Sequence, residues 1–239
     1  MPNDASKTMQ HQHLLNTREL SCVRGENTLF EKLNMDVSEG QCVHIVGENG
    51  SGKTSLLRIL CGLNKPENGQ ILWCDDSINL SDQLAKELIY VGHKDGLKNE
   101  LTAIENLAFQ QRLECHYDED LLDDALAKLK ILHCADLAAQ ALSFGQRRRL
   151  AFARLLLSPK KIWVLDEPFT GIDVSGRTLI EQLCVEHLKR KGAIVLSHHQ
   201  SLQASPLNHF TTELLIESFR PQKESEQTKA RKEILGVGS

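Results

Sequence analysis

Hydrophobic and polar positions follow two different spacings along this 239-residue chain. Between residues 18 and 73, short apolar runs broken by Gly, Asn and Asp have the pattern of strands, and one stretch, 54–63, has apolar residues at helical spacing. From 81 to 142, one strand-like run precedes two segments, 100–113 and 121–132, with the periodicity of amphipathic helices. The pattern therefore predicts strands with one helix in the first third, followed by a mostly helical insertion.

The last third alternates helices with strands. A helix is expected from Ser143, and the near-continuous apolar runs 161–165 and 193–197 flank a second helical segment, 176–191. Strands that are apolar throughout are typical of a parallel sheet that helices cover on both faces. The fold class predicted from this pattern is α/β.

Aperiodic or charge-rich segments stand at both ends of the chain. We expect a polar extension over residues 1–15, one domain over 16–220 with its helical subdomain at about 81–160, and a charged tail over 221–239. No run of 18 apolar residues and no apolar core of signal-peptide length occurs. The sequence therefore predicts a cytosolic protein without a membrane span.

Charge and cysteine usage narrow the classes of function. With 28 basic and 32 acidic residues the net charge is −4, which argues against a surface that coats nucleic acid. The seven cysteines are odd in number, widely spread and without a C-x-x-C pair, so neither a disulfide framework nor a zinc site is expected. We interpret them as reduced thiols that are mostly buried.

The strongest chemical signal is the segment from Gly47 to Thr54, which matches the phosphate-loop pattern G-x-x-x-x-G-K-[ST] between a strand-like run and a helical one. Its glycines let backbone N–H groups converge on phosphate oxygens, Lys53 supplies positive charge, and the Thr54 hydroxyl can reach Mg²⁺. The alternative to a phosphate-binding loop is a glycine-rich turn without a ligand. The residues expected to bind the nucleotide are Gly47, Glu48, Asn49, Gly50, Ser51, Gly52, Lys53, Thr54 and Ser55.

Two carboxylates end the apolar run 161–165. Asp166 and Glu167 are expected at the carboxyl edge of the sheet, where α/β proteins bind their ligands. Asp166 can hold Mg²⁺ through a water molecule, and Glu167 can polarise the attacking water as a general base. Beside a phosphate loop, this pair predicts nucleotide hydrolysis rather than two carboxylates that only solvate a strand end.

A third element, L-S-F-G-Q at 142–146, begins the helix expected from Ser143 as an S-x-x-Q capping box. With phosphate loop, L-S-x-G-Q and D-E-P in this order, the chain resembles the ATP-binding-cassette (ABC) ATPases from about Leu20 to Leu202. The resemblance implies an ABC-type nucleotide-binding domain that hydrolyses ATP with Mg²⁺. It also implies a mixed sheet around the phosphate-loop helix and a helical subdomain that carries the L-S-x-G-Q signature.

The same resemblance implies a head-to-tail dimer with a second copy of the chain. Ser143, Gly145 and Gln146 match the signature residues that grip the γ-phosphate held by the partner's phosphate loop, and Phe144 stands where the family has glycine. Phe144 reduces the local backbone freedom but leaves the anion site of the helix end in place. Asp173 matches the aspartate of the D-loop, which crosses the dimer seam.

Three further positions take their expected roles from the resemblance alone. The family's switch histidine, which contacts the γ-phosphate, corresponds to His198 or His199, and the glutamine that follows favours His199. His93 replaces the Q-loop glutamine and is expected to contact the metal or the attacking water and to couple the site to a membrane partner; the alternative is an ordinary loop histidine. Arg24 stands where relatives stack an aromatic ring on adenine, and a guanidinium can stack there or serve as a surface charge.

The segments V-G-H at 91–93 and L-T-A-I-E-N-L at 101–107 are similar to one subfamily, the ATP-binding subunits of bacterial cytochrome c maturation systems. The similarity implies a peripheral ATPase on the cytoplasmic face of the inner membrane, docked on integral subunits, whose turnover drives release of a haem-loaded periplasmic chaperone. Direct haem binding is not expected, because no C-x-x-C-H motif occurs. The alternative is the ATPase subunit of another small-molecule transporter, which would share every catalytic motif.

Overall fold

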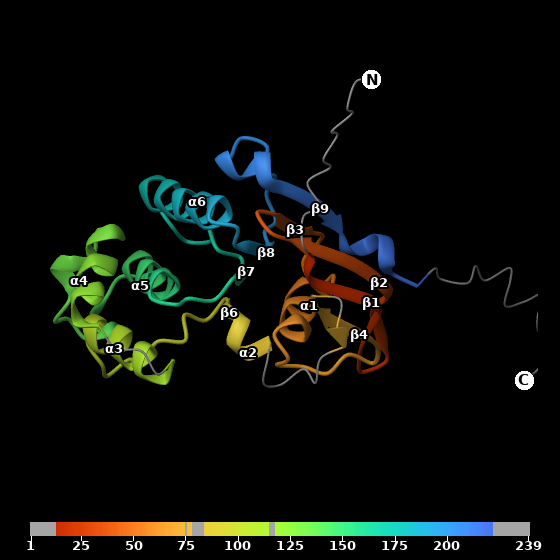
Figure 1. The fold of residues 1–239 in the computed structure, drawn as a ribbon, viewed down its shortest axis with the longest axis horizontal. Coiled ribbons are helices and arrows are strands. Elements are labelled where there is room, and N and C mark those ends of the chain that lie inside the picture. Colours follow the sequence, from red (N-terminus) through yellow and green to blue (C-terminus); the bar gives the residue numbers. More distant parts are fainter. Residues whose placement is uncertain (1–12, 75, 78–83, 115–117, 222–239) are drawn as a thin grey trace, which may run out of the picture.

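The computed structural model describes residues 13–74, 76–77, 84–114 and 118–221. Figure 1 shows strands gathered at one end of the molecule and a group of helices at the other. Four strands of the N-terminal third form an antiparallel sheet. Its strands lie in the order β2 (Asn27–Ser38), β1 (His13–Arg24), β4 (Asn68–Trp73) and β5 (Asp76–Ser77).

The second sheet is parallel throughout. Its strands lie in the order β6 (Leu88–Val91), β7 (Ile162–Asp166), β8 (Ala193–Ser197), β3 (Cys42–Val46) and β9 (Thr211–Leu215). Every residue of β7 and β8 is buried, which explains why their sequences are apolar without alternation. The α/β fold class is confirmed, and the mixed strand directions are divided between two sheets.

Helices cover both faces of the parallel sheet. The helix after the phosphate loop, α1 (Lys53–Leu60), packs between the two sheets, and α6 (Val174–Lys189) covers the other face of the parallel sheet. The remaining helices are α2 (Leu84–Glu87), α3 (Ala103–Leu113), α4 (Glu119–Lys128) and α5 (Phe144–Leu156), with 3₁₀ turns at Leu132–Cys134, Ala139–Ala141, Pro206–Phe210 and Ile216–Phe219. The helices α3, α4 and α5 form the group drawn in green shades in Figure 1.

The two faces of β7 face two different hydrophobic cores. Ile162 and Val164 pack in the core that includes α1 and the antiparallel sheet, and Trp163 and Leu165 pack in the core that includes the helical group. This alternation follows from the period of two in a strand. The strand that leads to Asp166 and Glu167 is therefore packed from both sides.

Several predicted boundaries can be placed on this fold. β1 begins at His13, inside the segment expected as an extension, and β6 belongs to the parallel sheet although it lies within the range 81–160 expected for the helical subdomain. The first twelve residues and 222–239, which make up nearly all of the expected tail, lie outside the described residues.

The cysteines and the membrane prediction can be checked for the described part of the chain. Six cysteines are free thiols, four of them buried, and Cys115 lies outside the described residues. Burial raises the pKa of Cys42 to about 12, which keeps that thiol protonated and unreactive. Across the described ranges, no helix has the length and apolar character needed to cross a bilayer.

Candidate active site

The phosphate loop connects β3 to α1 and is curled around its own lysine. The Lys53 side chain is buried, and its Nζ donates hydrogen bonds to the carbonyl oxygens of Gly47 at 2.6 Å and Glu48 at 2.8 Å. Gly52 begins the helix at φ 107°, a conformation that favours glycine, and a Cβ there would lie 3.1 Å from the Cβ of Leu29. The loop therefore presents backbone N–H groups and a cation at one helix N-terminus.

Asp166 is the meeting point of three elements. Its carboxylate accepts hydrogen bonds from the Thr54 hydroxyl at 3.0 Å, the Ser197 hydroxyl at 2.6 Å and the Tyr90 hydroxyl at 3.4 Å. Burial, with a contribution from the Asp166 charge, raises the pKa of Tyr90 above its ordinary range, so this phenol stays a donor. Residues 112 positions apart in the chain, Thr54 and Asp166, are thus brought into direct contact.

Glu167 follows Asp166 with a left-handed backbone, at φ 48°. Its N–H donates to the carbonyl oxygen of Ser197 at 3.1 Å, and its Oε2 accepts from Nδ1 of both His198 and His199 at 3.0 Å each. Burial alone would raise the pKa of Glu167, but the hydrogen bonds from the two histidines and their charges outweigh it and lower the pKa to about 2. The carboxylate is therefore ionised at neutral pH.

Six residues of the phosphate loop and the two carboxylates, from two of the predicted segments, line one cavity of about 240 Å³. Leu29 of β2 also lines it, although nothing in the local sequence had indicated a role for this residue. The cavity is lined by Leu29, Asn49, Gly50, Gly52, Lys53, Thr54, Ser55, Asp166 and Glu167. The phosphate loop and both carboxylates thus line the same cavity.

The signature residues line a different cavity. Ser143 caps α5: its hydroxyl accepts from the Gln146 N–H at 3.3 Å, and the Gln146 side chain accepts from the Ser143 N–H at 2.9 Å, which confirms the predicted capping box. Their cavity has a volume of about 420 Å³. It is lined by Lys130, Ile131, His133, Ser143, Gly145, Gln146, Arg149, Gly171 and Asp173. None of these residues lines the phosphate-loop cavity.

The D-loop segment connects the two regions. Asp173 caps α6 through the Gly176 N–H at 3.1 Å and pairs with Arg149 at 2.7 Å. Hydrogen bonds from Ser175 and then Arg149 lower the pKa of Asp173 to about 2. Asp173 therefore touches the signature helix within its own chain.

Arg148 is a residue that the motif analysis missed. Its side chain is buried, and its guanidinium donates to the carbonyl oxygens of Gly92 at 2.7 Å, Asp166 at 3.0 Å and Glu167 at 2.9 Å. It therefore ties the signature helix to both the Q-loop segment and the catalytic strand. The helical spacing could have indicated that this arginine is buried, because Arg148 is four residues before the apolar Phe152 and so lies on the apolar side of α5.

Glu217 is a second residue without a predicted role. It belongs to the last 3₁₀ turn, and its Oε1 accepts from the Glu48 N–H at 2.6 Å. A Cβ on Gly47 would lie 2.7 Å from the Glu217 carboxylate, so the phosphate loop needs glycine there. No local pattern in the sequence could have indicated this contact across 169 positions.

Two predicted residues lie apart from the phosphate-loop cavity. His93 is exposed, and within the described ranges it makes no hydrogen bond or ion pair with Thr54 or Asp166. Arg24 is exposed at the end of β1 and does not line the cavity. Their metal-contacting and adenine-stacking roles stay predictions.

Comparison with known families decides which proteins share this arrangement. The family profile described as ABC transporter matches residues 30–170. The chain belongs to the ABC transporter family. As a family member it is a nucleotide-binding ATPase, and the resemblance inferred from the motifs is confirmed.

Within the ABC transporter family, several curated relatives of the chain share one name. The cytochrome c biogenesis ATP-binding export protein CcmA of Aliivibrio fischeri is 45% identical over 190 residues, which cover 79% of this chain and 93% of that protein. CcmA of Haemophilus influenzae is 45% identical over 201 residues, covering 83% and 95%. The chain is thus a member of the CcmA group, the ATPase subunits of the cytochrome c biogenesis ABC system.

Solved structures of ABC transporter proteins have the same fold. A putative ABC transporter ATP-binding protein from Pyrococcus furiosus superposes with a TM-score of 0.74 at 24% identity, covering 87% of this chain and 99% of that one. A dimeric ATP-binding cassette bound to ADP and phosphate gives 0.74 at 23% identity, covering 85% and 95%. At these identities the likeness establishes the fold.

Proposed function

We propose that the chain hydrolyses Mg²⁺-bound ATP on the cytoplasmic face of the bacterial inner membrane and drives cytochrome c maturation. The observation that carries this proposal is the convergence of the phosphate loop, Asp166 and Glu167 on one cavity. CcmA relatives at 45% identity support the choice of system.

The donor set fits a magnesium ion. A carboxylate and a hydroxyl, from Asp166 and Thr54, lie 3.0 Å apart at the phosphate loop, and oxygen ligands of this kind are those that Mg²⁺ prefers. When bound, the ion neutralises charge on the β and γ phosphates. Lys53, which now donates to two loop carbonyls, exchanges these partners for the phosphate oxygens of ATP.

Glu167 is the base that orients the attacking water. Its carboxylate is ionised and lines the cavity, and a positioned carboxylate base typically contributes roughly 10²- to 10⁴-fold to a rate. His199 is the switch histidine that reaches the γ-phosphate, because its ring is half exposed whereas His198 is buried. His93 and Arg24 take the metal or water contact and the adenine contact, respectively, once ATP is bound.

A second copy of the chain completes the site. Ser143, Gly145 and Gln146 line a cavity that shares no residue with the phosphate-loop cavity, so one chain cannot bring its own signature onto its own ATP. A head-to-tail dimer places the signature of each copy over the phosphate loop of the other. The exposed D-loop, with Asp173, lies between the two motifs and meets the partner along the same seam.

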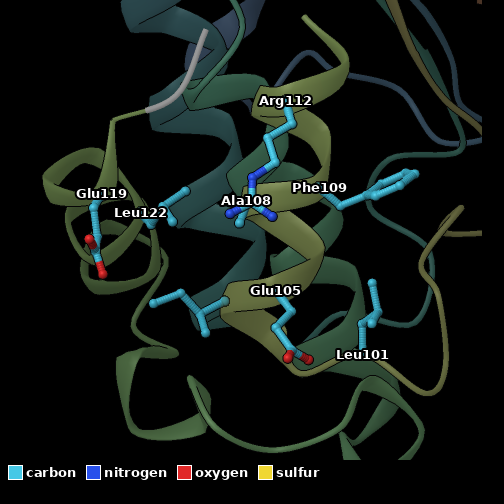
Figure 2. A pocket seen from close by; sticks show the side chains of 8 residues that line it. Leu101, Glu105, Ala108, Phe109, Arg112, Glu119 and Leu122 are labelled. Atoms are coloured by element: carbon cyan, nitrogen blue, oxygen red, sulfur yellow. The ribbon is translucent and has the colours of Figure 1, made fainter. Parts of the chain in front are cut away.

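The helical group offers a surface for the membrane subunits. In Figure 2, Glu119 and Leu122 come from α4, and the Phe109 ring points to the opposite side of α3. Together with Leu101, Glu105 and Arg112, these residues line one cavity with both apolar and charged side chains. Its volume is about 460 Å³, and Phe109 is 40% exposed although it is aromatic. Exposed apolar side chains beside charged ones are typical of a protein interface.

Arg148 supplies the link between this surface and the site. It joins Gly92, next to His93, to the backbone of Asp166 and Glu167, so movement of the helical group is transmitted to the catalytic carboxylates. Hydrolysis thereby becomes work on the membrane subunits. The work we propose is the release of the haem-loaded periplasmic chaperone, without haem binding to this chain.

The test compares wild type with Glu167→Gln, co-expressed with the membrane subunits, and scores ATP turnover together with release of haem-loaded chaperone. Both signals are expected to fall at least ~100-fold in the variant. The matched control is Glu31→Gln, a change of the same kind at an exposed position of β2, which should leave turnover intact. If turnover falls while chaperone release continues, the site assignment stands and the alternative transporter function replaces the proposed one.

A further inference from the structure

Two adjacent imidazoles donate to the same oxygen of Glu167. Nδ1 of His198 and Nδ1 of His199 each lie 3.0 Å from Oε2, and their ring centroids are 4.8 Å apart. A carboxylate accepts only, so both Nδ1 atoms are donors. The function proposed above uses one of these histidines, and the other has no role yet.

The two rings differ in their freedom to move. The His198 side chain is 2% exposed and the His199 side chain 51% exposed. Phe169 packs edge-on against the His198 ring at a centroid distance of 5.2 Å, and the Nε2 atom of the buried His44 donates to the His198 carbonyl oxygen at 3.0 Å. His198 is therefore held from two sides, while His199 can leave Glu167.

Open space into which the His199 ring can turn lies beside the phosphate loop. Its ring lines an open cavity of about 710 Å³ beside the phosphate loop, together with Gly47, Glu48 and Asn49. A ring that turns from Glu167 to the γ-phosphate gives up one of the hydrogen bonds on Oε2. The carboxylate must then keep its orientation with the donors that remain.

Glu167 needs side-chain restraints of this kind. Its φ of 48° lies in the left-handed region, a strained conformation for a residue with a Cβ that persists only where the surroundings hold it. Thr170 donates to the same Oε2 at 3.2 Å, and within the described ranges Oε1 receives no hydrogen bond. Oε2 is thus the anchored oxygen, and Oε1 is left for water.

We propose that His198 is a positioning residue that keeps Glu167 in place through the catalytic cycle. It retains Oε2 when His199 turns to the γ-phosphate, so that Oε1 stays aimed at the attacking water. This inference rests on the roles proposed above for Glu167 and His199. His198 itself touches neither the nucleotide nor the water.

A metal site is the other arrangement that these three side chains suggest, since their ligand atoms lie within 4.8 Å of one another. Metal binding through Nδ1 would move the imidazole proton of His198 to Nε2. That atom is buried without a hydrogen-bond partner, and metal-bound histidines normally donate this second N–H to an acceptor. The hydrogen-bonding role is therefore the one that the geometry favours.

The experiment measures kcat and KM for ATP in the assembled complex for His198→Asn, His198→Gln and His198→Phe. The Asn amide lies where Nδ1 lies and can still donate to Oε2; the Gln amide reaches one bond further, and Phe keeps the ring without a donor. We expect kcat to fall about 10- to 100-fold in the Phe and Gln variants with KM within about twofold, and Asn to recover kcat to within about threefold.

Equal activity of the Asn and Gln variants would overturn the inference, as would a Phe variant with wild-type kcat. The contrast between Asn and Gln remains informative even if the Phe variant does not fold. The control is His187→Phe. The His187 ring stacks on Trp163 with a centroid distance of 3.8 Å and does not contact Glu167, so this change should leave kcat unchanged. Loss of turnover in Glu167→Gln with normal turnover in His198→Phe refutes only this inference, whereas normal turnover in Glu167→Gln refutes the proposed function itself.

Discussion

The carboxyl edge of the parallel sheet and the start of α5 both carry nucleotide motifs, yet they are built differently. At the sheet edge, side chains from separate elements bond to one another: Thr54 and Ser197 both donate to Asp166, which is almost fully buried. At the start of α5, the side chains of Ser143 and Gln146 each accept a hydrogen bond from the other's backbone N–H, and both residues remain accessible.

This difference shows which half of the site one chain can complete. The sheet edge is preorganised, because its polar groups already have the neighbours that orient them for catalysis. The signature is an anion-binding helix end whose surroundings within the chain hold no phosphate loop. In the function proposed above, folding of one chain completes the first half, and association with a second copy completes the other.

The contrast between the two regions is tested most strongly by damaging the phosphate loop in one copy of the chain and the signature in the other. Lys53→Ala and Ser143→Arg are each expected to lower turnover at least ~100-fold alone, because each damages both sites of a homodimer. Co-expressed with different tags, they form mixed dimers that hold one intact site. The population should recover about a quarter of wild-type turnover if the dimer is head-to-tail and symmetric.

The control for that experiment pairs Lys53→Ala with the Lys53→Ala/Ser143→Arg double variant, a mixture that contains no intact phosphate loop. It should show no recovery. Full inactivity of the first mixture would mean that the signature acts within its own chain, and the contrast between the two regions would then be wrong.

Arg148 tests whether the two regions are mechanically joined. Arg148→Met leaves the buried carbonyl oxygens of Gly92 and Asp166 without this donor, so the free energy of unfolding should fall by about 2–4 kcal/mol. Denaturant unfolding measures it. Lys128→Met removes an exposed pair with Glu186 and should cost about 0–1 kcal/mol. Equal losses in both variants would show that Arg148 joins nothing.

Gly171 tests the place where the D-loop touches the signature. Its φ is 72°, and a Cβ there would lie 2.8 Å from Cδ1 of Phe144. Gly171→Ala is therefore expected to lower the free energy of unfolding by about 2 kcal/mol. Adding Phe144→Ala should recover about half of this loss, because it removes the steric contact but leaves the backbone strain. Thermal unfolding of the single and double variants checks this. Additive effects would contradict a direct contact.

The smallest expected effect concerns pH and lies away from both motifs. Burial lowers the pKa of His187 to about 4, while the unfolded chain takes up its proton near pH 6.5. The unfolded state therefore binds more protons between these values, and the free energy of unfolding should fall as pH drops from 6.5 to 4. The size is on the order of 1 kcal/mol, because the ring is only partly shielded from solvent.

His187→Phe provides the comparison for that titration. The ring can still stack on Trp163, but it has no proton to gain, so the slope of stability against pH between 6.5 and 4 should decrease. An unchanged slope would assign the pH dependence to other groups. Above pH 6.5 the two proteins should differ little in slope, since His187 is neutral in both states there.

The sequence carried the motifs and the fold class because both depend on short patterns. Gly47–Thr54 lies within one loop, and the capping box of Ser143 spans four residues, so the local chain determines their geometry. The apolar runs of β7 and β8 predicted a sheet that is covered on both faces. These are properties that neighbouring residues impose on one another.

Contacts between segments distant in sequence could not be predicted from short patterns. The Glu217 carboxylate on the phosphate loop, the Arg148 guanidinium on the catalytic strand and the second histidine on Glu167 depend on where whole elements come to lie. No local pattern encodes them, because a hydrogen bond between residues far apart in sequence exists only once packing has fixed both ends. Short patterns along the chain predicted which chemistry this protein carries, whereas the packing of distant elements sets which side chains hold the reacting groups in place.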